Sequence, residues 1–490
     1  MSLDRFLRSS KNNMNKFHLF LTNFIIYGFG GIISKIVPLI MVPVVTRIMP
    51  NSDYYGLSDM SNTIVSFCSA FAIMGMYDAM YRMFFEKEDE DYKKKVCSTA
   101  FLFTIGTSFI VFLVMVALKK YISAFFFDNG KYAYLVYLTA IATLVGATNS
   151  IISAPTRMEN KRKVFLVTNT LSPVLSYSIS IPLLFHGYYV IALPLAGCIS
   201  GVAMEISFGI MNHKWFSISL FDKSTLWTLL KIGVPLLPNF LIYWVFNSCD
   251  RVMITRILGI GESGIYSVGA KLGMASQLIY TAFAGGWQYF AFSTMKEGNQ
   301  VESNSKVFEY LGVISFVSSM FVFSWAEPIY KLLFTEEYHR AFIVSPYLFL
   351  APLLQMLFQV EANQFLVIKK TWPNFFILSA GAIANLFINL VFIPVMGIEG
   401  AAIATLAGYA ISDVICTIVL VKMKLMVVSK RFLIVVMSSI VSILLWRIAM
   451  LHNTLLMTLF SVCFVLFMGS LYRYELQKIY KLVRGEKNGT

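Results

Sequence analysis

The sequence has little charge and few of the residues that carry catalysis. Only 13% of its 490 residues are charged and 57% are hydrophobic, whereas about a quarter of residues are charged in soluble domains. It contains five histidines and neither an HExxH pattern nor a Walker A pattern (GxxxxGK[ST]). Zinc-peptidase chemistry and ATP hydrolysis by this chain are therefore not expected. We expect no catalytic residues, no metal site and no cofactor.

The six cysteines indicate neither a disulfide framework nor a metal site. They fall almost entirely inside apolar runs and show no CxxC spacing, so they are interpreted as small hydrophobic residues. The formal net charge of +14 would suit a nucleic acid only if it formed a basic face in water. Because the background is apolar, no nucleic-acid partner is expected.

What dominates the chain is long apolar runs. A helix needs roughly 20 apolar residues to span a membrane, and only helices satisfy the backbone in lipid when the runs are this uniform. We predict an all-α integral membrane protein with about fourteen transmembrane helices. The predicted spans are residues 19–48, 62–83, 97–118, 133–154, 164–185, 188–211, 228–257, 261–289, 308–327, 343–367, 374–394, 399–421, 431–449 and 454–472. At two tight joints, His186 to Gly187 and Met396 to Glu399, each pair of spans could instead be one long helix.

The basic residues predict the topology. Clusters such as Lys93–Lys95, Lys161–Lys163 and Lys422–Arg431 alternate along the chain with loops that hold only scattered cations. The positive-inside rule places these clusters in the cytoplasm. No signal peptide is expected before the first span, and both termini are predicted to be cytoplasmic.

The chain repeats itself at an offset of about 210 residues, which fits duplication of a whole helical bundle. The matching segments include Thr46–Ile48 with Gly56 against Thr255–Ile257 with Gly264, and Ile181–Gly187 against Ile393–Gly397. Six spans separate each pair, so the two copies have the same orientation and are parallel repeats. We predict six-helix lobes at residues 1–212 and 213–425, followed by two further helices and a basic tail at 426–490. In transporters built this way the substrate site lies between the lobes.

One stretch resembles a known family. Asp250–Gly259 (DRVMITRILG), continuing through Gly264–Leu272, resembles the polysaccharide-biosynthesis flippases called Wzx. These belong to the multidrug/oligosaccharidyl-lipid/polysaccharide (MOP) exporter superfamily, together with the lipid II flippase MurJ and the MATE drug exporters. The segments Lys231–Pro238 and Ile393–Gly408 are similar to the same family, and the resemblance covers nearly the whole chain.

The resemblance implies two six-helix bundles around a central cavity in a bacterial plasma membrane. It implies a flippase that moves an undecaprenyl-pyrophosphate-linked oligosaccharide to the outer leaflet by alternating access. Membrane lipids and a polysaccharide polymerase and ligase are the implied partners. MurJ-like relatives have cationic cavity residues on spans 1, 2 and 8. Lys35 and Lys271 occupy comparable places on spans 1 and 8, but span 2 has no deep cation, which departs from a lipid II flippase.

Lys35 and Lys271 are the sharpest candidates for substrate binding. Each lies about ten residues inside an apolar span, where an unpartnered charge costs roughly 2.5–3.5 kcal/mol. Two ammonium groups from opposite lobes could neutralise a diphosphate, and Lys holds a phosphate as a point charge that can be released. Alternatively, span 1 starts later and Lys35 lies near the interface, and Lys271 is a structural lysine bonded to carbonyls.

Asp250 and Arg251 lie two-thirds of the way along the seventh span. Neighbours on a helix point about 100° apart, so separate partners are expected. Asp250 is a candidate to pair with Lys271 until substrate arrives, or to bind a coupling proton or cation. A permanent ion pair that stabilises the bundle is the competing interpretation.

Three amides on the tenth span share one helix face. Gln355, Gln359 and Asn363 repeat at four-residue spacing. They could line a cavity that contacts sugar, or they could hydrogen-bond across helices and hold the bundle together.

Two other function classes compete with the flippase. A MATE-like antiporter that exports organic cations would favour an acidic cavity, whereas Lys35, Lys271 and Arg251 are cations. A membrane-bound glycosyl- or acyltransferase would need a soluble catalytic domain or an aspartate/histidine-rich loop, and the connections are too short for either. The sequence therefore favours an anionic, lipid-linked substrate.

Overall fold

The computed structural model describes residues 36–273, 275–281, 283, 287, 300–370 and 372–477. These residues divide into two compact units, and each unit is described here by itself. Unit 1 consists of Met1–Val268 with Asn385–Ala401, and unit 2 of Gly269–Ala384 with Ala402–Thr490. The lobe boundaries expected from the repeat, near residues 212 and 425, stay predictions.

The described residues are almost entirely helical, and the prediction of an all-α membrane fold is confirmed. Ten described helices are long and apolar enough to cross a membrane, or twelve if each of two bent pairs is counted as one span. Two of the predicted spans, 19–48 and 261–289, fall partly outside the described residues. The protein is a multi-pass membrane protein.

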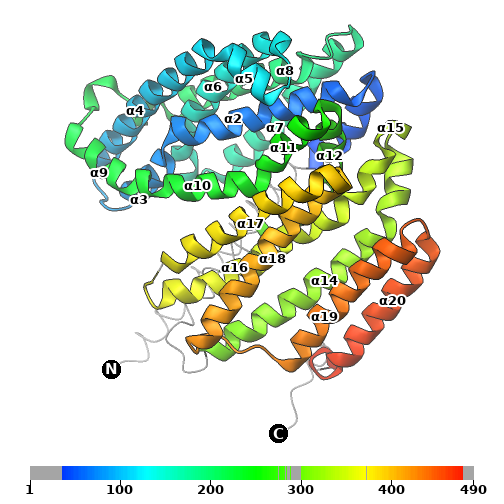
Figure 1. Cartoon of the computed structure of the whole chain (residues 1–490). Helices are drawn as coiled ribbons and strands as arrows, with labels where there is room; N and C mark the ends of the chain where they lie inside the picture. Colours follow the sequence, from blue (N-terminus) through cyan, green and yellow to red (C-terminus); the bar gives the residue numbers. More distant parts are fainter. Residues whose placement is uncertain are drawn as a thin grey trace, which may run out of the picture. The chain divides into compact units, whose positions relative to one another are not determined.

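Unit 1 is built around the long helix α6. Its elements are the helix Ile36–Ile48, α2 (Ser52–Ile73), α3 (Met76–Phe84), α4 (Glu90–Ala117), α5 (Lys119–Phe126), α6 (Ala133–Met158), α7 (Arg162–Phe185), α8 (Ala192–Asn212), α9 (Lys223–Gly233), α10 (Leu237–Trp244), α11 (Asp250–Leu258) and the start of α12 (Ile260–Gly273). Helix α6 packs against α2, α4 and α8, and α7 lies beside α8 (Figure 1). Met80, Ala100, Ile151 and Trp215 form part of the buried core at one end of this bundle.

The predicted seventh span is a single apolar segment that is locally irregular. Residues Lys223–Leu258 run through α9, α10 and α11. A 3₁₀ turn at Val234–Leu236 contains Pro235, which has no N–H for a regular helix bond. A π-helical turn at Val245–Cys249 directly precedes Asp250. Such a turn inserts an extra residue into the helix and changes which way the following side chains point.

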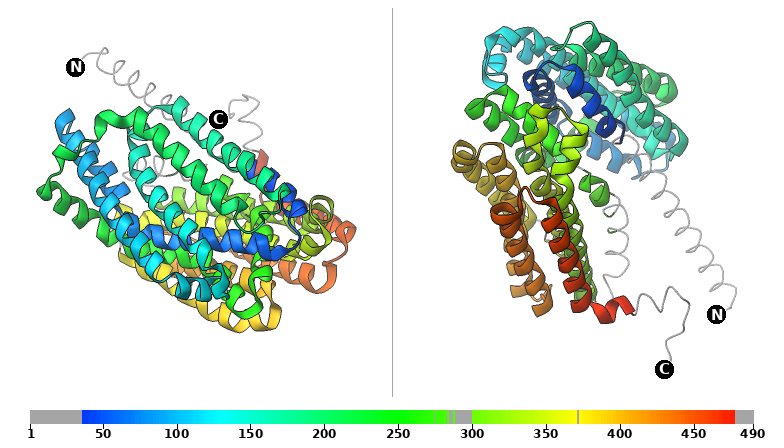
Figure 2. Two further views of the ribbon diagram at one scale, coloured as in Figure 1. Left: turned by 90° about the horizontal axis from the view of Figure 1, so that it is seen from above. Right: turned by 90° about the vertical axis from the view of Figure 1, so that its right-hand side faces the viewer.

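Unit 2 consists of α14 (Gln300–Leu333), α15 (Glu336–His339), α16 (Ser345–Val367), most of α17 (Trp372–Met396) and α18 (Ile398–Lys422), α19 (Lys430–Leu445) and α20 (Thr454–Leu471). Helix α14 packs against α16, α19 and α20 (Figure 1; Figure 2). The hydroxyls of Ser324 and Ser461 lie 2.8 Å apart between α14 and α20. The buried Trp446 contacts the ring of Phe323 with centroids 4.7 Å apart. The last two helices are thus fixed to α14 by both polar and aromatic contacts.

The two tight joints are real turns. Helix α7 ends at Phe185 and Gly187 has a φ of +84°, while α17 ends at Met396 and Gly397 has a φ of +64°. Glycine adopts this left-handed conformation without a steric penalty, which is why it stops these helices. The neighbouring spans are therefore separate, as the sequence-based assignment has them.

The repeat-related glycines Gly56 and Gly264 meet in unit 1. A Cβ atom on Gly56 would lie 2.2 Å from the carbonyl oxygen of Ile260, and one on Gly264 would lie 2.3 Å from that of Ser52. Helices α2 and α12 therefore cross with their backbones in contact, as small residues permit in membrane proteins. Positions that match in the sequence repeat thus form one contact in space.

We predict that Gly56→Ala and Gly264→Ala lower the thermal stability of the purified protein, because each methyl group would overlap a backbone carbonyl. Overpacking costs typically about 1–3 kcal/mol. Gly106→Ala on α4 is the matched control, because nothing lies within 4 Å of its would-be Cβ. The measurement is the thermal unfolding midpoint in detergent, monitored by fluorescence-detected size-exclusion chromatography. Equal midpoints for all three variants would contradict the close crossing.

Candidate functional site

A buried ion cluster joins α2, α11 and α12 inside unit 1. The Arg251 Nε lies 2.7 Å from Asp59 Oδ2, and their side chains are only 7% and 10% exposed. Arg251 Nη1 is also 3.5 Å from Asp250 Oδ1, and the Arg251 backbone N–H donates to the same oxygen at 2.8 Å. A single arginine thus lies between two aspartates.

Further groups satisfy the remaining polar atoms of this cluster. The Tyr266 hydroxyl donates to Asp250 Oδ2, and the Ser267 hydroxyl donates to Asp59 Oδ2 at 2.5 Å. Arg251 Nη1 donates to the carbonyl of Asn247 in the π-helical turn. The extra residue of that turn leaves this carbonyl available to a side chain, so the local irregularity serves the cluster.

The geometry favours a structural role for this cluster. Asp250 and Arg251 have different main partners, Tyr266 and Asp59, but they also contact each other. Removing one partner of a buried pair leaves an uncompensated charge, whereas the intact and hydrogen-bonded pair is tolerated. The guanidinium of Arg251 is paired with Asp59 and lies next to Asp250, so carboxylates of the protein already occupy two of its sides. A substrate-binding role for Asp250 and Arg251 stays a prediction.

The two predicted lysines are placed differently. Lys35 lies outside the described residues. Lys271 is half-buried on α12 and has interactions within the chain. Their joint action on a diphosphate stays a prediction.

The predicted amide face lies on α16 in unit 2. Gln355 and Gln359 are half-buried and Asn363 is 3% exposed. The buried Oε1 of Gln359 and Nδ2 of Asn363 have no hydrogen-bond partner in the described part of the chain. These atoms are available to a ligand or to water, and a cavity at this face stays a prediction.

Two buried carboxylates lie next to this face. Glu361 on α16 is 1% exposed and accepts a hydrogen bond from Thr417 on α18. Asp413 on α18 is 8% exposed, and neither of its oxygens has a hydrogen-bond partner among the described residues. Two neighbouring carboxylates in a medium of low dielectric cannot both stay ionised without a counter-charge. The pair is therefore suited to hold a proton or a cation.

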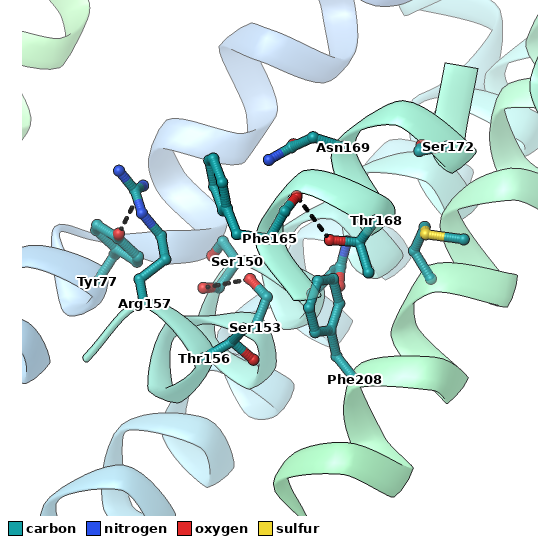
Figure 3. A pocket seen from close by; sticks show the side chains of 12 residues that line it. Tyr77, Ser150, Ser153, Thr156, Arg157, Phe165, Thr168, Asn169, Ser172 and Phe208 are labelled. Carbon is teal, nitrogen blue, oxygen red and sulfur yellow. Dashed lines mark hydrogen bonds between the residues drawn. The ribbon is translucent and has the colours of Figure 1, made fainter. Parts of the chain in front are cut away.

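A polar pocket of about 320 Å³ opens inside unit 1 between α3, α6, α7 and α8 (Figure 3). Its lining residues are Tyr77, Asn149, Ser150, Ser153, Thr156, Arg157, Phe165, Thr168, Asn169, Ser172, Met204 and Phe208. Arg157 Nη1 donates to the Tyr77 hydroxyl at 3.1 Å, and its guanidinium stacks over the Phe165 ring at 5.2 Å. Of the described residues that line it, one is a cation and none is an acid.

The acid closest in sequence to this arginine is already paired. Glu159 forms ion pairs with Lys161 at 2.6 Å and with Lys214 at 2.8 Å. Burial alone would raise the pKa of Glu159, but the hydrogen bonds from the two lysines outweigh burial and hold that pKa below its ordinary value. Glu159 is thus paired with two lysines, and Arg157 has no acidic partner in the described part of the chain.

Comparison with known families shows to which family the chain belongs. The family model described as "Polysaccharide biosynthesis protein" matches residues 44–343. The chain belongs to this family. Among curated proteins, none matches the sequence significantly.

Solved structures show which fold this family member has. The chain is similar to the lipid II flippase MurJ in an inward closed conformation, with a TM-score of 0.70, 15% identity, and coverage of 94% of this chain and 99% of that chain. It is similar to an inward-facing MATE multidrug transporter, with a TM-score of 0.58, 14% identity, and coverage of 80% and 98%. A MOP-superfamily transporter from Pyrococcus furiosus gives a TM-score of 0.60 at 12% identity, covering 83% and 95%. The expected likeness in fold to MurJ and the MATE transporters is confirmed, and these neighbours are themselves described as a flippase and as transporters.

Sequence reasoning missed Asp59, Asp413 and the role of Arg157 in a pocket. Asp59 precedes the predicted start of its span at residue 62, so it was assigned to a loop, whereas α2 begins at Ser52. The repeat held a signal, because Asp59 aligns with Ser267 at the offset that relates Gly56 to Gly264, and the two side chains are bonded. Arg157 lies beyond the predicted end of its span at residue 154, so hydropathy gave no reason to place it in a pocket, whereas α6 continues to Met158.

We predict that Arg251→Ala destabilises the folded protein by about 3–5 kcal/mol, because Asp59 and Asp250 would be left buried without a cation. Arg256→Ala is the control on the same helix. Arg256 pairs with Asp128 at the same 2.7 Å, but both side chains are about half exposed, so its loss should cost only about 0–1 kcal/mol. Denaturation midpoints in detergent measure both. Similar losses for the two variants would show that the Arg251 cluster is not buried in the native protein.

We predict that replacing the buried acid Asp413 in unit 2, in contrast to replacing Arg251, costs the folded protein little stability. Asp413→Asn should change the unfolding free energy by less than about 1 kcal/mol, or increase it, because Asp413 has no cationic partner among the described residues to lose. Asp59→Asn, in contrast, removes the carboxylate that pairs with Arg251 and should cost several-fold more. A loss for Asp413→Asn as large as that for Asp59→Asn would show that Asp413 has a permanent counter-ion.

Proposed function

We propose that this protein flips an undecaprenyl-pyrophosphate-linked oligosaccharide from the cytoplasmic to the outer leaflet of the bacterial plasma membrane. The flipped glycan would then serve cell-surface polysaccharide biosynthesis, with a polymerase and a ligase as later partners. The observation that carries the proposal is that a member of a polysaccharide biosynthesis family is a multi-pass membrane protein. Both termini are proposed to lie in the cytoplasm.

The helical architecture supports transport rather than synthesis. In residues 36–273 and 300–477, helices follow one another with short connections, whereas an independent catalytic domain needs about 50 residues or more. A membrane protein without such a domain contributes to polysaccharide assembly most directly by moving an intermediate.

The fold supports alternating access as the mechanism. One similar structure is a lipid II flippase in an inward closed conformation, and similar MATE transporters adopt inward-facing and outward-facing conformations. A fold that exists in both states can expose a site to each leaflet in turn. We propose that this chain uses the same kind of motion for its lipid-linked substrate.

The proposed substrate contacts are the cations that the sequence singles out. Lys35 and Lys271 would neutralise the diphosphate, while the polyprenyl tail stays in lipid. The amides of Gln355, Gln359 and Asn363 would contact sugar hydroxyls. Asp250 and Arg251 are proposed to support this site by fixing α11 to α2 and α12 rather than by binding the phosphate.

Energy for net movement would come from an ion gradient, the membrane potential or the glycan gradient, since the sequence has no Walker A pattern. Moving one charge through 100 mV is worth about 2.3 kcal/mol. An anionic headgroup moving outward is therefore sensitive to voltage.

A MATE-like antiporter for organic cations is the second candidate function. The observation that favours it is the buried carboxylate pair Glu361 and Asp413, which is suited to a proton or cation. Family membership favours the flippase. If the protein is a flippase, Glu361 and Asp413 would serve as the site of ion coupling and not of substrate binding.

The test is transbilayer movement of an undecaprenyl-pyrophosphate-linked oligosaccharide in proteoliposomes. We predict that Lys35→Ala and Lys271→Ala each reduce flipping at least tenfold, because each removes a cation that balances the diphosphate, while Arg at either position restores part of the rate.

Lys306→Ala is the control for this experiment. Lys306 is more than half exposed and pairs with Glu302 on α14, so its removal should leave flipping unchanged. Flipping by the wild type that survives both lysine replacements would remove these lysines from the site. Organic-cation uptake without glycan flipping would assign the protein to the antiporter function.

A further inference from the structure

The pocket beside Arg157 contains a set of groups that the proposed transport site does not use. Eight of the lining residues are uncharged and polar, and only Phe165, Met204 and Phe208 are apolar. In a helical bundle within lipid, polar side chains cluster where they face water or a ligand rather than hydrocarbon. Hydrogen-bonding groups of eight residues therefore border this pocket within one unit, beside the apolar surface of the three others.

The pocket extends inward from one end of the bundle. From Arg157 to Asn149 is eight residues along α6, which corresponds to about 12 Å at 1.5 Å per residue. Arg157 is exposed, whereas Asn149 is half-buried. The charged group thus lies at the outer end of the pocket and neutral amides lie further in.

The charge of the lining selects an anion. Among the residues that the structure describes, Arg157 has no acidic partner and no carboxylate lines the pocket. Its guanidinium is held in place by the Tyr77 hydroxyl and the Phe165 ring, as Figure 3 shows. An arginine fixed in this way presents its remaining donors to a phosphate at little cost in side-chain freedom.

The inner part of the pocket selects hydroxyl groups. Asn169 on α7 lines the pocket, and its amide makes no hydrogen bond within the described part of the chain. The Oδ1 of Asn149 on α6 is buried and has no hydrogen-bond partner in the ranges that the structure describes. Ser153 and Thr168 donate to backbone carbonyls, so their oxygens remain able to accept. The Asn169 amide can donate and accept, and the oxygens of Asn149, Ser153 and Thr168 can accept, so neutral hydrogen-bonding groups suited to the vicinal hydroxyls of a sugar lie here.

The size of the pocket limits the ligand. Its volume of about 320 Å³ is at the low end of the range for small-molecule sites, roughly 300–1,000 Å³. A single phosphorylated sugar unit fits this range, whereas a whole lipid-linked oligosaccharide does not.

We propose that this pocket binds a phosphorylated sugar unit, with Arg157 contacting the phosphate and Asn169 contacting the sugar hydroxyls. The proposal rests on the function proposed above in one respect, namely that the glycan headgroup of the flipped substrate is the source of that unit. A free sugar phosphate and a phospholipid headgroup offer related chemistry, and the experiment separates these sources.

The experiment measures binding to the purified full-length protein by isothermal titration. The probes are N-acetylglucosamine 1-phosphate, inorganic phosphate, methyl glucoside, and nanodiscs with or without phosphatidylglycerol. We expect saturable binding of the sugar phosphate that is stronger than binding of either phosphate or methyl glucoside. No saturable binding of the sugar phosphate at millimolar concentration would overturn the proposal.

Three variants locate the binding. Arg157→Gln should weaken sugar-phosphate binding about tenfold or more, as expected for loss of a charge-assisted contact. Asn169→Leu should weaken binding of the sugar phosphate but not of inorganic phosphate. Arg82→Gln is the control, because Arg82 is an exposed arginine on α3 that does not line the pocket. Equal affinities for wild type, Arg157→Gln and Asn169→Leu would overturn the proposal.

Flipping assays on the same variants separate the pocket from the proposed function. Wild-type flipping that falls in Asn169→Leu and Arg157→Gln, but not in Arg82→Gln, supports the pocket as a site for the substrate's headgroup. Arg157-dependent binding of the sugar phosphate by a protein that flips no glycan supports the pocket with a free sugar phosphate as ligand and removes the flippase function. Arg157-dependent binding of phosphatidylglycerol without binding of the sugar phosphate identifies a lipid headgroup and overturns the proposal.

Discussion

The low dielectric of a membrane interior is the constraint on which the rest of this structure depends. Every deep charge must find a counter-charge, a proton or a polar cavity. Unit 1 meets the constraint with Arg251 between Asp59 and Asp250, closed by hydroxyls from α12. The cluster joins three helices that are far apart in the sequence, and a π-helical turn supplies one of its acceptors. Burial decides how much this cluster contributes to the stability of the fold. The Arg256–Asp128 pair is equally short, but it lies on the surface and therefore contributes little to the free energy of unfolding.

Unit 2 meets the same constraint differently. Glu361 and Asp413 are buried near enough to interact and have no cation among the described residues, so the pair must hold a proton or a bound ion. Unit 1 thus contains a compensated cluster and unit 2 an uncompensated pair. Compensated charges fix helices in place, whereas uncompensated ones respond to ions. This division fits a transporter that needs both a rigid part and an ion-sensitive part.

The pocket beside Arg157 represents a third way to keep polar groups in a bundle, namely around an open polar volume. It lies within one unit, so its shape does not depend on how the two units are arranged. Binding at such a pocket and transport through an alternating site are separable properties. A flippase must recognise a headgroup before it moves one, and a pocket with one arginine and several neutral hydrogen-bonding groups is suited to that first step.

The sequence by itself determined the fold class, the family and most of the spans, because hydropathy and glycine turns act locally. The spans on either side of Gly187 and Gly397 and the apolar span that carries Asp250 and Arg251 followed from hydropathy, whereas the structure settled that the two joints are turns and revealed the irregular turns inside that span. The partner of each polar side chain could not be predicted, because a hydrogen bond such as that between Asp59 and Ser267 depends on which faces of two helices come into contact. Hydropathy windows also failed to place Asp59 in a span, because a hydropathy scale scores a buried acid that is paired in the fold in the same way as an acid in a loop.

Only the tertiary structure decided which charges are compensated. It paired Arg251 with an acid from α2, left Asp413 without a cation in the described residues, and placed Arg157 in the lining of a polar pocket. The physical reason is that charge energetics depend on distance and burial in three dimensions. A sequence fixes which ionisable groups a membrane protein has, and the packing of its helices fixes what each of them can do.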